Sequence, residues 1–286
     1  MTTPCEKAAI LVEALPYIRD FYGRTVVVKY GGSAMADCRL RKAVMEDIVL
    51  MRYVGMHPIV VHGGGPNITR MLKRLGISTR FVDGLRITDE ETMEVVEMVL
   101  VGKINKDIVA GLNDMGGLAV GLSGKDGMLI RADHMSGKEH LGFVGQVREI
   151  NTGVLETITE KGYIPVISPI GAGNHGQSFN INADHVASAL ATALKADKLV
   201  LLTDVPGILA VPDDVSSRIS RLRASEVESY IDCGIISGGM IPKVECCVEA
   251  LQGGVNRTHI LDGRIPHSIL LEIFTDEGIG SMVVNG

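Results

Sequence analysis

Short apolar runs alternate along the chain with longer segments whose apolar residues recur at helical spacing. The runs are rich in β-branched residues, which predicts strands that are buried on both faces of a sheet. These predicted strands cover residues 25–30, 58–62, 118–122, 163–170, 198–204, 258–261 and 281–284. The predicted helices cover residues 40–54, the segment from the turn at 63–66 to 75, 90–115, 183–196, 225–233 and 240–252. This alternation predicts an α/β fold with a mostly parallel sheet and helices on both faces.

Two segments depart from the simple alternation. Residues 128–132 and 143–150 alternate apolar and polar positions, which predicts a hairpin at the edge of the sheet. Residues 5–22 carry an apolar stripe at helical spacing, and Pro16 inside it predicts a kink or break. Because this helix precedes the first strand, we expect its apolar face to cover a surface of its own chain or of another subunit.

Composition and charge narrow the functional classes. The chain has 286 residues, enough for one large domain or two closely packed ones. Its net charge of -6 and its lack of a basic block argue against a nucleic-acid partner. Neither a membrane span nor a secretory signal is predicted. The cysteines form no paired spacing, so we expect no zinc or disulfide framework and a reduced, cytoplasmic setting; they are Cys5, Cys38, Cys233, Cys246 and Cys247.

Two glycine turns follow neighbouring strands. The first is KYGGS at 29–33, and the second is HGGGPN at 62–67. Ligands of open α/β folds bind at the carboxyl ends of parallel strands, where glycines and helix N-termini present N–H groups to anions. Lys29 adds a positive charge that suits a phosphoryl group in transfer. The alternative is that the glycines only allow two tight turns of the backbone. Two such turns with a lysine beside them favour phosphate binding.

Two more segments carry charge at a predicted helix start. Lys243 ends the segment SGGMIPK at 237–243, where the helix dipole disfavours a cation unless an anion lies nearby. Asp184 ends the segment FNINAD at 179–184. A carboxylate between the two lysines would hold both in position and would also help to place Mg²⁺. The alternatives are a solvated surface lysine and a carboxylate that caps its own helix.

A third glycine motif does not fit its usual function. Residues 171–176 match GxGxxG after a strand, but the next helix starts only near residue 183, whereas a dinucleotide site needs a helix inside the motif. An NAD-dependent dehydrogenase is therefore a weaker alternative to a phosphate-binding enzyme. The chain has no GxxxxGK[ST] segment, which disfavours a Walker-type NTPase.

The chain resembles the amino acid kinase family, and within it the N-acetylglutamate kinases, on six motifs in order: KYGG (29–32), VHGGGP (61–66), DGLRIT (83–88), FNINAD (179–184), LTDVPGIL (202–209) and GGMIPK (238–243). The resemblance implies a three-layer αβα sandwich with a central, mainly parallel sheet. It also implies that ATP, with Mg²⁺, phosphorylates the side-chain carboxylate of N-acetyl-L-glutamate. No protein ligand for the magnesium ion is assigned.

The resemblance also implies roles for individual residues. Those in the catalytic group are Lys29 and Lys243, which stabilise the phosphoryl charge, and Asp184, which organises them. The implied nucleotide-phosphate ligands are Gly31 and Gly32. The implied substrate ligands are Gly64, Gly65, Arg86 and Asn180. Residues 202–209 and the chain up to Lys243 would line the adenine and ribose pocket.

The two ends of the chain resemble the arginine-inhibited, hexameric branch of these kinases. The implied division is an interlacing helix at 1–22, an acetylglutamate lobe at 23–195, and an ATP lobe at 196–286 that also carries the arginine-sensing end. The implied ligands of L-arginine are Tyr17, His259, Glu272 and Gly278. A homo-oligomer built as a trimer of dimers is expected, and the nitrogen-signalling protein PII is a further candidate partner.

Two alternatives within this fold stay open. One is a kinase for another acceptor, namely acetylaminoadipate, glutamate, aspartate, carbamate or UMP. Arg86 with Asn180 favours an acceptor with an α-carboxylate and an acylated amine, but the sequence does not give the pocket size. The other alternative is a non-catalytic arginine sensor, against which Lys29, Asp184 and Lys243 argue.

Overall fold

The computed structural model describes residues 3–275 and 278–286, so residues 1–2 of the predicted N-terminal segment and 276–277 of the C-terminal stretch lie outside the described residues. Within the described chain, the central sheet has eight strands in the order β12-β14-β13-β11-β1-β2-β8-β5. The strands are β1 Thr25–Tyr30, β2 His57–His62, β5 Ala119–Ser123, β8 Ile164–Ser168, β11 Lys198–Thr203, β12 Arg221–Arg223, β13 Arg257–Asp262 and β14 Ser281–Val284. Only β12 and β14 run against the others. The predicted α/β class with a mainly parallel sheet is confirmed.

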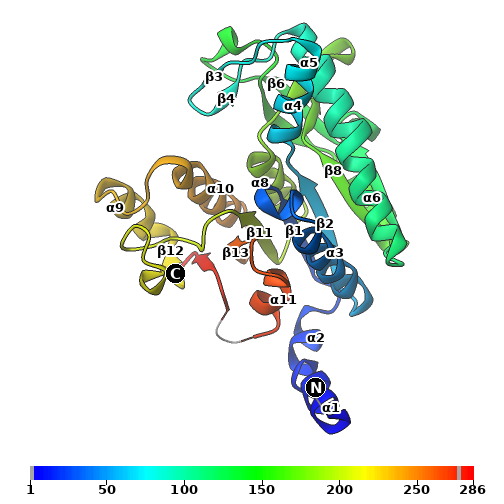
Figure 1. Cartoon of the computed structure of the whole chain (residues 1–286), viewed down its shortest axis with the longest axis vertical. Helices are drawn as coiled ribbons and strands as arrows, with labels where there is room; N and C mark the ends of the chain where they lie inside the picture. The colour runs from blue at the N-terminus through cyan, green and yellow to red at the C-terminus, as the bar shows by residue number, and fades with distance from the viewer. Residues whose placement is uncertain (1–2, 276–277) are drawn as a thin grey trace.

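Alternate residues of the strands in the middle of the sheet pack into two separate cores, which explains the continuous apolar runs. Val26 and Val28 of β1 pack in one core, and Val27 packs in the other. The first core is closed by α3 Cys38–Tyr53, α4 Gly65–Leu75, α6 Asn105–Asp114 and α11 Ser268–Ile273. The second is closed by α7 Gly153–Glu160, α8 Ala183–Ala193, α9 Val227–Asp232 and α10 Ile241–Gln252. The sheet therefore lies between two helical layers (Figure 1).

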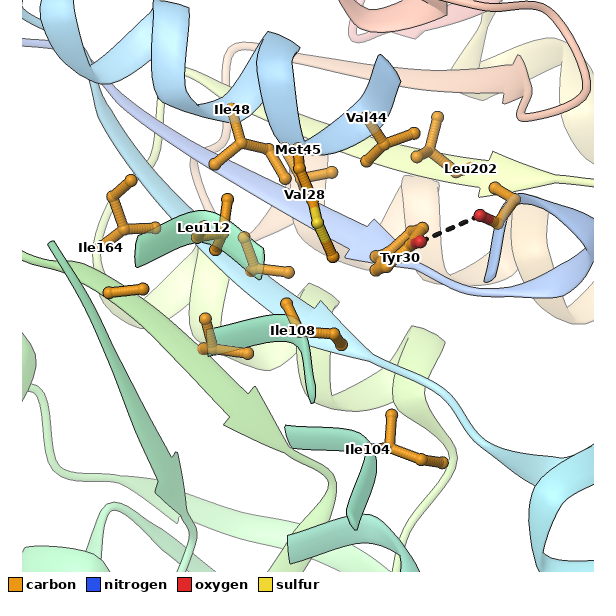
Figure 2. Packing of buried hydrophobic residues seen from close by; sticks show 14 of the residues in the cluster. Val28, Tyr30, Val44, Met45, Ile48, Ile104, Ile108, Leu112, Ile164 and Leu202 are labelled. Carbon is orange, nitrogen blue, oxygen red and sulfur yellow. Dashed lines mark hydrogen bonds between the residues drawn. The ribbon is translucent and has the colours of Figure 1, made fainter. Parts of the chain in front are cut away.

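The first core fixes the turn that follows β1. Figure 2 shows Tyr30 and Val28 against Val44, Met45 and Ile48 of α3. The buried Tyr30 hydroxyl donates a hydrogen bond to the carbonyl oxygen of Ala34 at 2.9 Å. The chain after β1 is thereby tied to the core at both ends of its glycine turn.

The segment predicted as one helix over 90–115 contains a widened turn. α5 spans Glu90–Glu97, a π-helical segment spans Met98–Ile104, and α6 follows directly. Leu100 and Ile104 of the π segment lie so close to Gly64 that a Cβ there would stand 2.5 Å from each. The helical spacing of apolar residues, averaged over the whole segment, barely changes when one residue is inserted. The sequence pattern therefore did not predict the π-helical segment.

Smaller sheets account for the other strands. β6 Ile130–His134 and β7 Gly145–Ile150 form the predicted antiparallel pair, but in a separate sheet with β9 Ile170–Ala172 and β10 Ser178–Asn180. The placement of this hairpin at the edge of the central sheet was therefore wrong. β3 Phe81–Val82 and β4 Leu85–Arg86 form a hairpin that was not predicted.

The N-terminal segment is two helices, α1 Pro4–Glu13 and α2 Leu15–Phe21. The break at Ala14 confirms the predicted effect of Pro16, which occupies the first turn of α2. α1 extends away from the rest of the chain in Figure 1, whereas Phe21 at the end of α2 packs against the first core. Ile10, Leu11 and Leu15 are 57%, 72% and 60% exposed. Among the helices in the described residues, none has the length and apolar character needed to span a membrane.

Candidate active site

Strand alternation aims Lys29 at the helical layer that contains α8. Lys29 follows Val27 by two residues, so both side chains leave β1 on the same face. Val27 packs with α8, and Asp184 lies in the first turn of that helix. The Lys29 ammonium nitrogen is 3.0 Å from Oδ1 of Asp184.

Lys243 reaches the same carboxylate from the neighbouring helix. It lies in the first turn of α10, and its ammonium nitrogen donates to Oδ2 of Asp184 at 2.9 Å. Burial alone would raise the pKa of Asp184, but the charges of Lys29 and Lys243 outweigh it and lower the pKa to about 2. The anion that a lysine at a helix start requires is thus Asp184, and the surface alternative for Lys243 is wrong.

Asn182, which the sequence analysis did not single out, caps α8. Its Oδ1 accepts a hydrogen bond from the backbone N–H of Asp184 at 2.7 Å. The Asp184 side chain is therefore available to the lysines, and the alternative that Asp184 is the helix cap is wrong. The stretch Asn-Ala-Asp contains the N-cap signal, since asparagine is among the best capping residues.

The two predicted glycine turns lie side by side. The N–H of Gly63 donates to the carbonyl oxygen of Tyr30 at 2.8 Å, which joins the end of β2 to the end of β1. Gly32 has a φ of 66°, and a Cβ there would stand 2.3 Å from Oδ1 of Asp204. A Cβ at Gly31 would stand 2.9 Å from the Lys29 ammonium nitrogen. Gly32 is favoured by both its conformation and the lack of space, whereas a side chain at Gly31 would require the Lys29 ammonium group to move.

A cavity of about 280 Å³ collects nearly all the predicted catalytic and substrate residues. It is lined by Lys29, Gly31, Gly32, Gly64, Gly65, Arg86, Asn180 and Asp184, together with eleven other residues. Lys243 is not part of the lining but joins the group through Asp184. Segments that are more than 150 residues apart in the chain therefore meet at one site, as the motifs predicted.

Arg86 is held in this cavity by neutral partners. Its Nη2 donates to the carbonyl oxygen of Gly65 at 3.1 Å and to Oγ1 of Thr69 at 2.8 Å. Its guanidinium carbon lies 4.6 Å from the centre of the Phe81 ring. Among the described residues, no acid forms an ion pair with Arg86, so its positive charge is available to an anionic ligand. Burial lowers the pKa of Arg86 from its ordinary value.

The hairpin that carries Arg86 has a signal that the sequence analysis missed. Asp83 and Gly84 occupy its turn with φ values of 51° and 77°. Two consecutive positive φ values are typical of the Asp-Gly turn of a two-residue hairpin. Asn180 reaches this region as well, since its Nδ2 donates to Oγ1 of Thr88 at 3.2 Å.

Beneath the second glycine turn lies a buried polar network. His62 Nδ1 is 3.0 Å from the Gly63 carbonyl oxygen. Its Nε2 lies 3.1 Å from Oγ of Ser168 and 3.3 Å from Nδ2 of Asn105. Burial lowers the pKa of His62 to about 4, so the ring is neutral at pH 7. Ser168 and Asn105 were not predicted, because their partners are distant in sequence.

A second cavity, of about 420 Å³, lies beyond β11. Residues 204–209 line it together with Met240, so it lies in the segment predicted to hold adenine and ribose. By contrast, the glycine motif at 171–176 joins β9 to β10 through a short turn over Asn174–Gly176. That path argues against a dinucleotide site at the motif.

Three of the four residues predicted to bind arginine are in contact. His259 Nδ1 lies 2.7 Å from Oε1 of Glu272, and a Cβ at Gly278 would stand 2.8 Å from Oε2. Tyr17 of α2 is nearby through an edge contact with Phe274, at 6.4 Å between ring centres. Burial would raise the pKa of Glu272, but hydrogen bonding and charge from His259 help to lower it to about 2.

The same region contains a lysine that the sequence analysis did not single out. The Lys198 ammonium nitrogen lies 3.5 Å from Nε2 of His259 and 4.7 Å from the centre of the Phe21 ring of α2. Burial lowers the pKa of Lys198 to about 8. The N-terminal helix and the C-terminal stretch are thus joined by polar and aromatic contacts.

Comparisons with known proteins agree with this geometry. A sequence model described as the amino acid kinase family matches residues 24–262. The chain is 67% identical over 280 residues to an acetylglutamate kinase of Syntrophomonas wolfei, with 98% of each covered. It is 62% identical over 293 residues to an acetylglutamate kinase of Pelotomaculum thermopropionicum, with 99% of each covered. The matched range includes Lys29, Asp184 and Lys243.

Among solved structures, the chain is similar to N-acetylglutamate synthase from Neisseria gonorrhoeae complexed with coenzyme A and N-acetyl-glutamate. The TM-score is 0.86 at 28% identity. The match covers 98% of this chain and 63% of the synthase chain. The same synthase complexed with coenzyme A and L-arginine gives a TM-score of 0.81 at 26% identity, with 98% of this chain and 65% of that protein covered.

Proposed function

Because this chain belongs to the amino acid kinase family, we propose that it transfers the γ-phosphoryl group of ATP to the side-chain carboxylate of N-acetyl-L-glutamate, a step of arginine biosynthesis. The full-length relatives named acetylglutamate kinase make it a kinase whose acceptor is a carboxyl group. The product is N-acetylglutamyl 5-phosphate. The observation that carries the proposal is one carboxylate that binds two lysines beside a cavity containing an arginine.

The two lysines supply the positive charge that phosphoryl transfer requires. Negative charge spreads over the phosphoryl oxygens during transfer, and fixed cations in a partly buried site stabilise it. Lys29 and Lys243 converge on Asp184 from a strand and a helix of different parts of the chain. Asp184 keeps both ammonium groups in place and offsets their mutual repulsion.

The acceptor needs no protein base, because a side-chain carboxylate is already ionised at pH 7. Catalysis then consists of positioning and of charge stabilisation. Arg86 pairs with the α-carboxylate of the substrate, and its planar guanidinium suits a bidentate contact. Asn180 holds the acetylated amine, while Gly64 and Gly65 direct backbone N–H groups at the reacting carboxylate.

The first glycine turn and the cavity beyond β11 suit the phosphates and the nucleoside of ATP. A side chain at Gly32 would meet Asp204, and one at Gly31 would displace the Lys29 ammonium group, as expected where backbone approaches phosphate. The nucleoside occupies the cavity lined by residues 204–209. Mg²⁺ bound with ATP would neutralise charge on the phosphate oxygens. Asp184 already binds two lysines, so those oxygens rather than this carboxylate would be the principal magnesium ligands.

The proposal extends to regulation. L-Arginine binds beside His259, Glu272 and Gly278, with Tyr17 on the helix side, and inhibits the enzyme. Glu272 supplies an ionised carboxylate for the guanidinium. The solved synthase complex with L-arginine supports an effector site on this fold.

The proposed assembly is a hexamer built as a trimer of dimers. The exposed apolar residues of α1 support an interlacing role for residues 1–22. Residues 23–195 form the acetylglutamate lobe, and 196–286 form the ATP lobe with the arginine-sensing end. The enzyme is proposed to be cytoplasmic, with PII as a candidate partner.

A coupled assay of ADP release tests the acceptor. The purified protein is given ATP, Mg²⁺ and each of N-acetylglutamate, N-acetylaminoadipate, glutamate, aspartate, carbamate and UMP. We expect the highest kcat/KM with N-acetylglutamate and loss of turnover in Lys29→Ala. Turnover with another acceptor but not with N-acetylglutamate would refute the proposal, and NAD binding without ATP binding would refute the kinase class itself.

A further inference from the structure

Three metal-ligating side chains meet between α8 and α10, outside the phosphoryl site. Cys246 and Glu249 lie three residues apart on α10, so their side chains share one helix face. His185 of α8 faces them, and its Nδ1 lies 3.4 Å from Sγ of Cys246. One ligand atom from each of the three residues lies within 4.8 Å of the other two. The cysteines show no paired spacing, so no zinc site was predicted; local spacing does not reveal this cluster, since His185 and Cys246 are 61 residues apart in the chain.

These separations suit a first-row divalent cation. Bonds of about 2.3 Å to sulfur and about 2.0–2.1 Å to nitrogen at a tetrahedral angle place the two ligand atoms about 3.6 Å apart. The observed 3.4 Å between Sγ and Nδ1 is close to that value. A thiolate, an imidazole and a carboxylate are ligands that Zn²⁺ accepts, whereas Mg²⁺ prefers oxygen ligands.

The surroundings supply access and negative charge. His185 and Glu249 line a cavity of about 430 Å³ between α8, α10 and β7, which admits an ion and a fourth ligand from solvent. A cation bound there displaces the thiol proton of Cys246, and the carboxylate of Glu249 contributes negative charge to the site.

We propose that His185, Cys246 and Glu249 form a site for one thiophilic divalent cation of the Zn²⁺ class. Three protein ligands leave one position for water. The site is separate from the magnesium that accompanies ATP, because its sulfur and nitrogen ligands select against that ion.

The site lies on the same two helices as the phosphoryl machinery. His185 directly follows Asp184 in α8, and Cys246 follows Lys243 by three residues in α10. The helices are also joined by Ser188, whose Oγ donates to the carbonyl oxygen of Cys246 at 3.0 Å. A bound ion links α8 and α10 through coordination bonds, and it thereby fixes the position of Asp184 relative to Lys243.

Cobalt titration of the full chain tests this site directly. The chelator-treated protein is titrated with Co²⁺, which reports thiolate ligation through a charge-transfer band in the near ultraviolet. We expect the band to saturate at one equivalent, to disappear when Zn²⁺ is added, and to persist in excess Mg²⁺. Cys246→Ser abolishes the band.

Two further variants keep the test decisive if the buried Cys246→Ser protein does not fold. Glu249 is exposed, and Glu249→Gln should weaken Co²⁺ binding by at least about 10-fold, the smallest loss expected when even an outer-shell partner is removed. Cys233→Ser is the matched control, because Cys233 is exposed and lies outside the cluster. Absence of the thiolate band, a band retained by Cys246→Ser, unchanged affinity in Glu249→Gln, or a band lost in Cys233→Ser would each overturn the proposal.

Discussion

The carboxylate of Asp184 can be neutralised with little change of shape by Asp184→Asn. In the native protein its two oxygens lie 3.0 Å from the Lys29 nitrogen and 2.9 Å from the Lys243 nitrogen. The amide keeps the volume of the side chain but leaves two partly buried ammonium groups without their shared anion. We therefore expect both the stability and the phosphoryl transfer rate to fall.

The pKa gives the magnitude of the stability loss. A fall from 3.8 to about 2, at about 1.4 kcal/mol for each pH unit, corresponds to roughly 2 kcal/mol of stabilisation by the ionised form. Because the pKa of Asp184 is lower in the folded state, this stabilisation is complete above the unfolded pKa. It is lost as the pH falls through about 2.

Urea unfolding of the native and variant proteins measures this difference across pH. The gap in unfolding free energy should stay near 2 kcal/mol from about pH 7 to 5 and close between about pH 4 and 2. The value of kcat should fall by about 100-fold or more, because both lysines lose their fixed position. Asp114→Asn is the control, since Asp114 is exposed at the end of α6 and should change stability by less than about 0.5 kcal/mol. A gap that is independent of pH, or an Asp184→Asn enzyme with native kcat, would refute the reasoning.

Three further predictions follow from the site. Arg86→Lys should raise the KM for N-acetylglutamate by about 10-fold or more, because a bidentate contact is lost; an equal rise in the KM for ATP would contradict this role. Gly32→Ala should raise the KM for ATP and destabilise the protein by at least about 1 kcal/mol, because φ is 66° and the new Cβ meets Asp204. Gly137→Ala, at φ 70° with open space around its Cβ among the described residues, should lose similar stability and keep its KM. Deletion of residues 1–22 should abolish arginine inhibition and convert hexamers to dimers, as measured by dose–response and analytical ultracentrifugation; unchanged inhibition would contradict the assignment.

The sequence predicted the central sheet well because buried parallel strands carry an unmistakable local pattern. The run TVVVKY became β1 with the predicted bounds, and residues 281–284 became β14. The π segment at Met98–Ile104 and the hairpin at Phe81–Arg86 were not predicted. The first depends on a single inserted residue, and the second on the positive φ angles of an Asp-Gly turn.

Residue chemistry predicted which groups would gather at the site but not how they are held. Lys29, Asp184 and Lys243 meet as the glycine motifs indicated. The support beneath them depends on contacts between distant segments, such as His62 Nε2 with Ser168 Oγ across 106 residues. No local periodicity encodes such a pair, so only the folded chain reveals it.

Trapping of the acyl phosphate tests the proposed reaction most directly. The enzyme is incubated with ATP, Mg²⁺, N-acetylglutamate and hydroxylamine, which converts an acyl phosphate to a hydroxamate that mass spectrometry identifies. We predict N-acetylglutamyl hydroxamate in amounts equal to the ADP released, and none with Lys29→Ala. ADP release without the hydroxamate, or hydroxamate formation that does not require Lys29, would contradict carboxylate phosphorylation at this site.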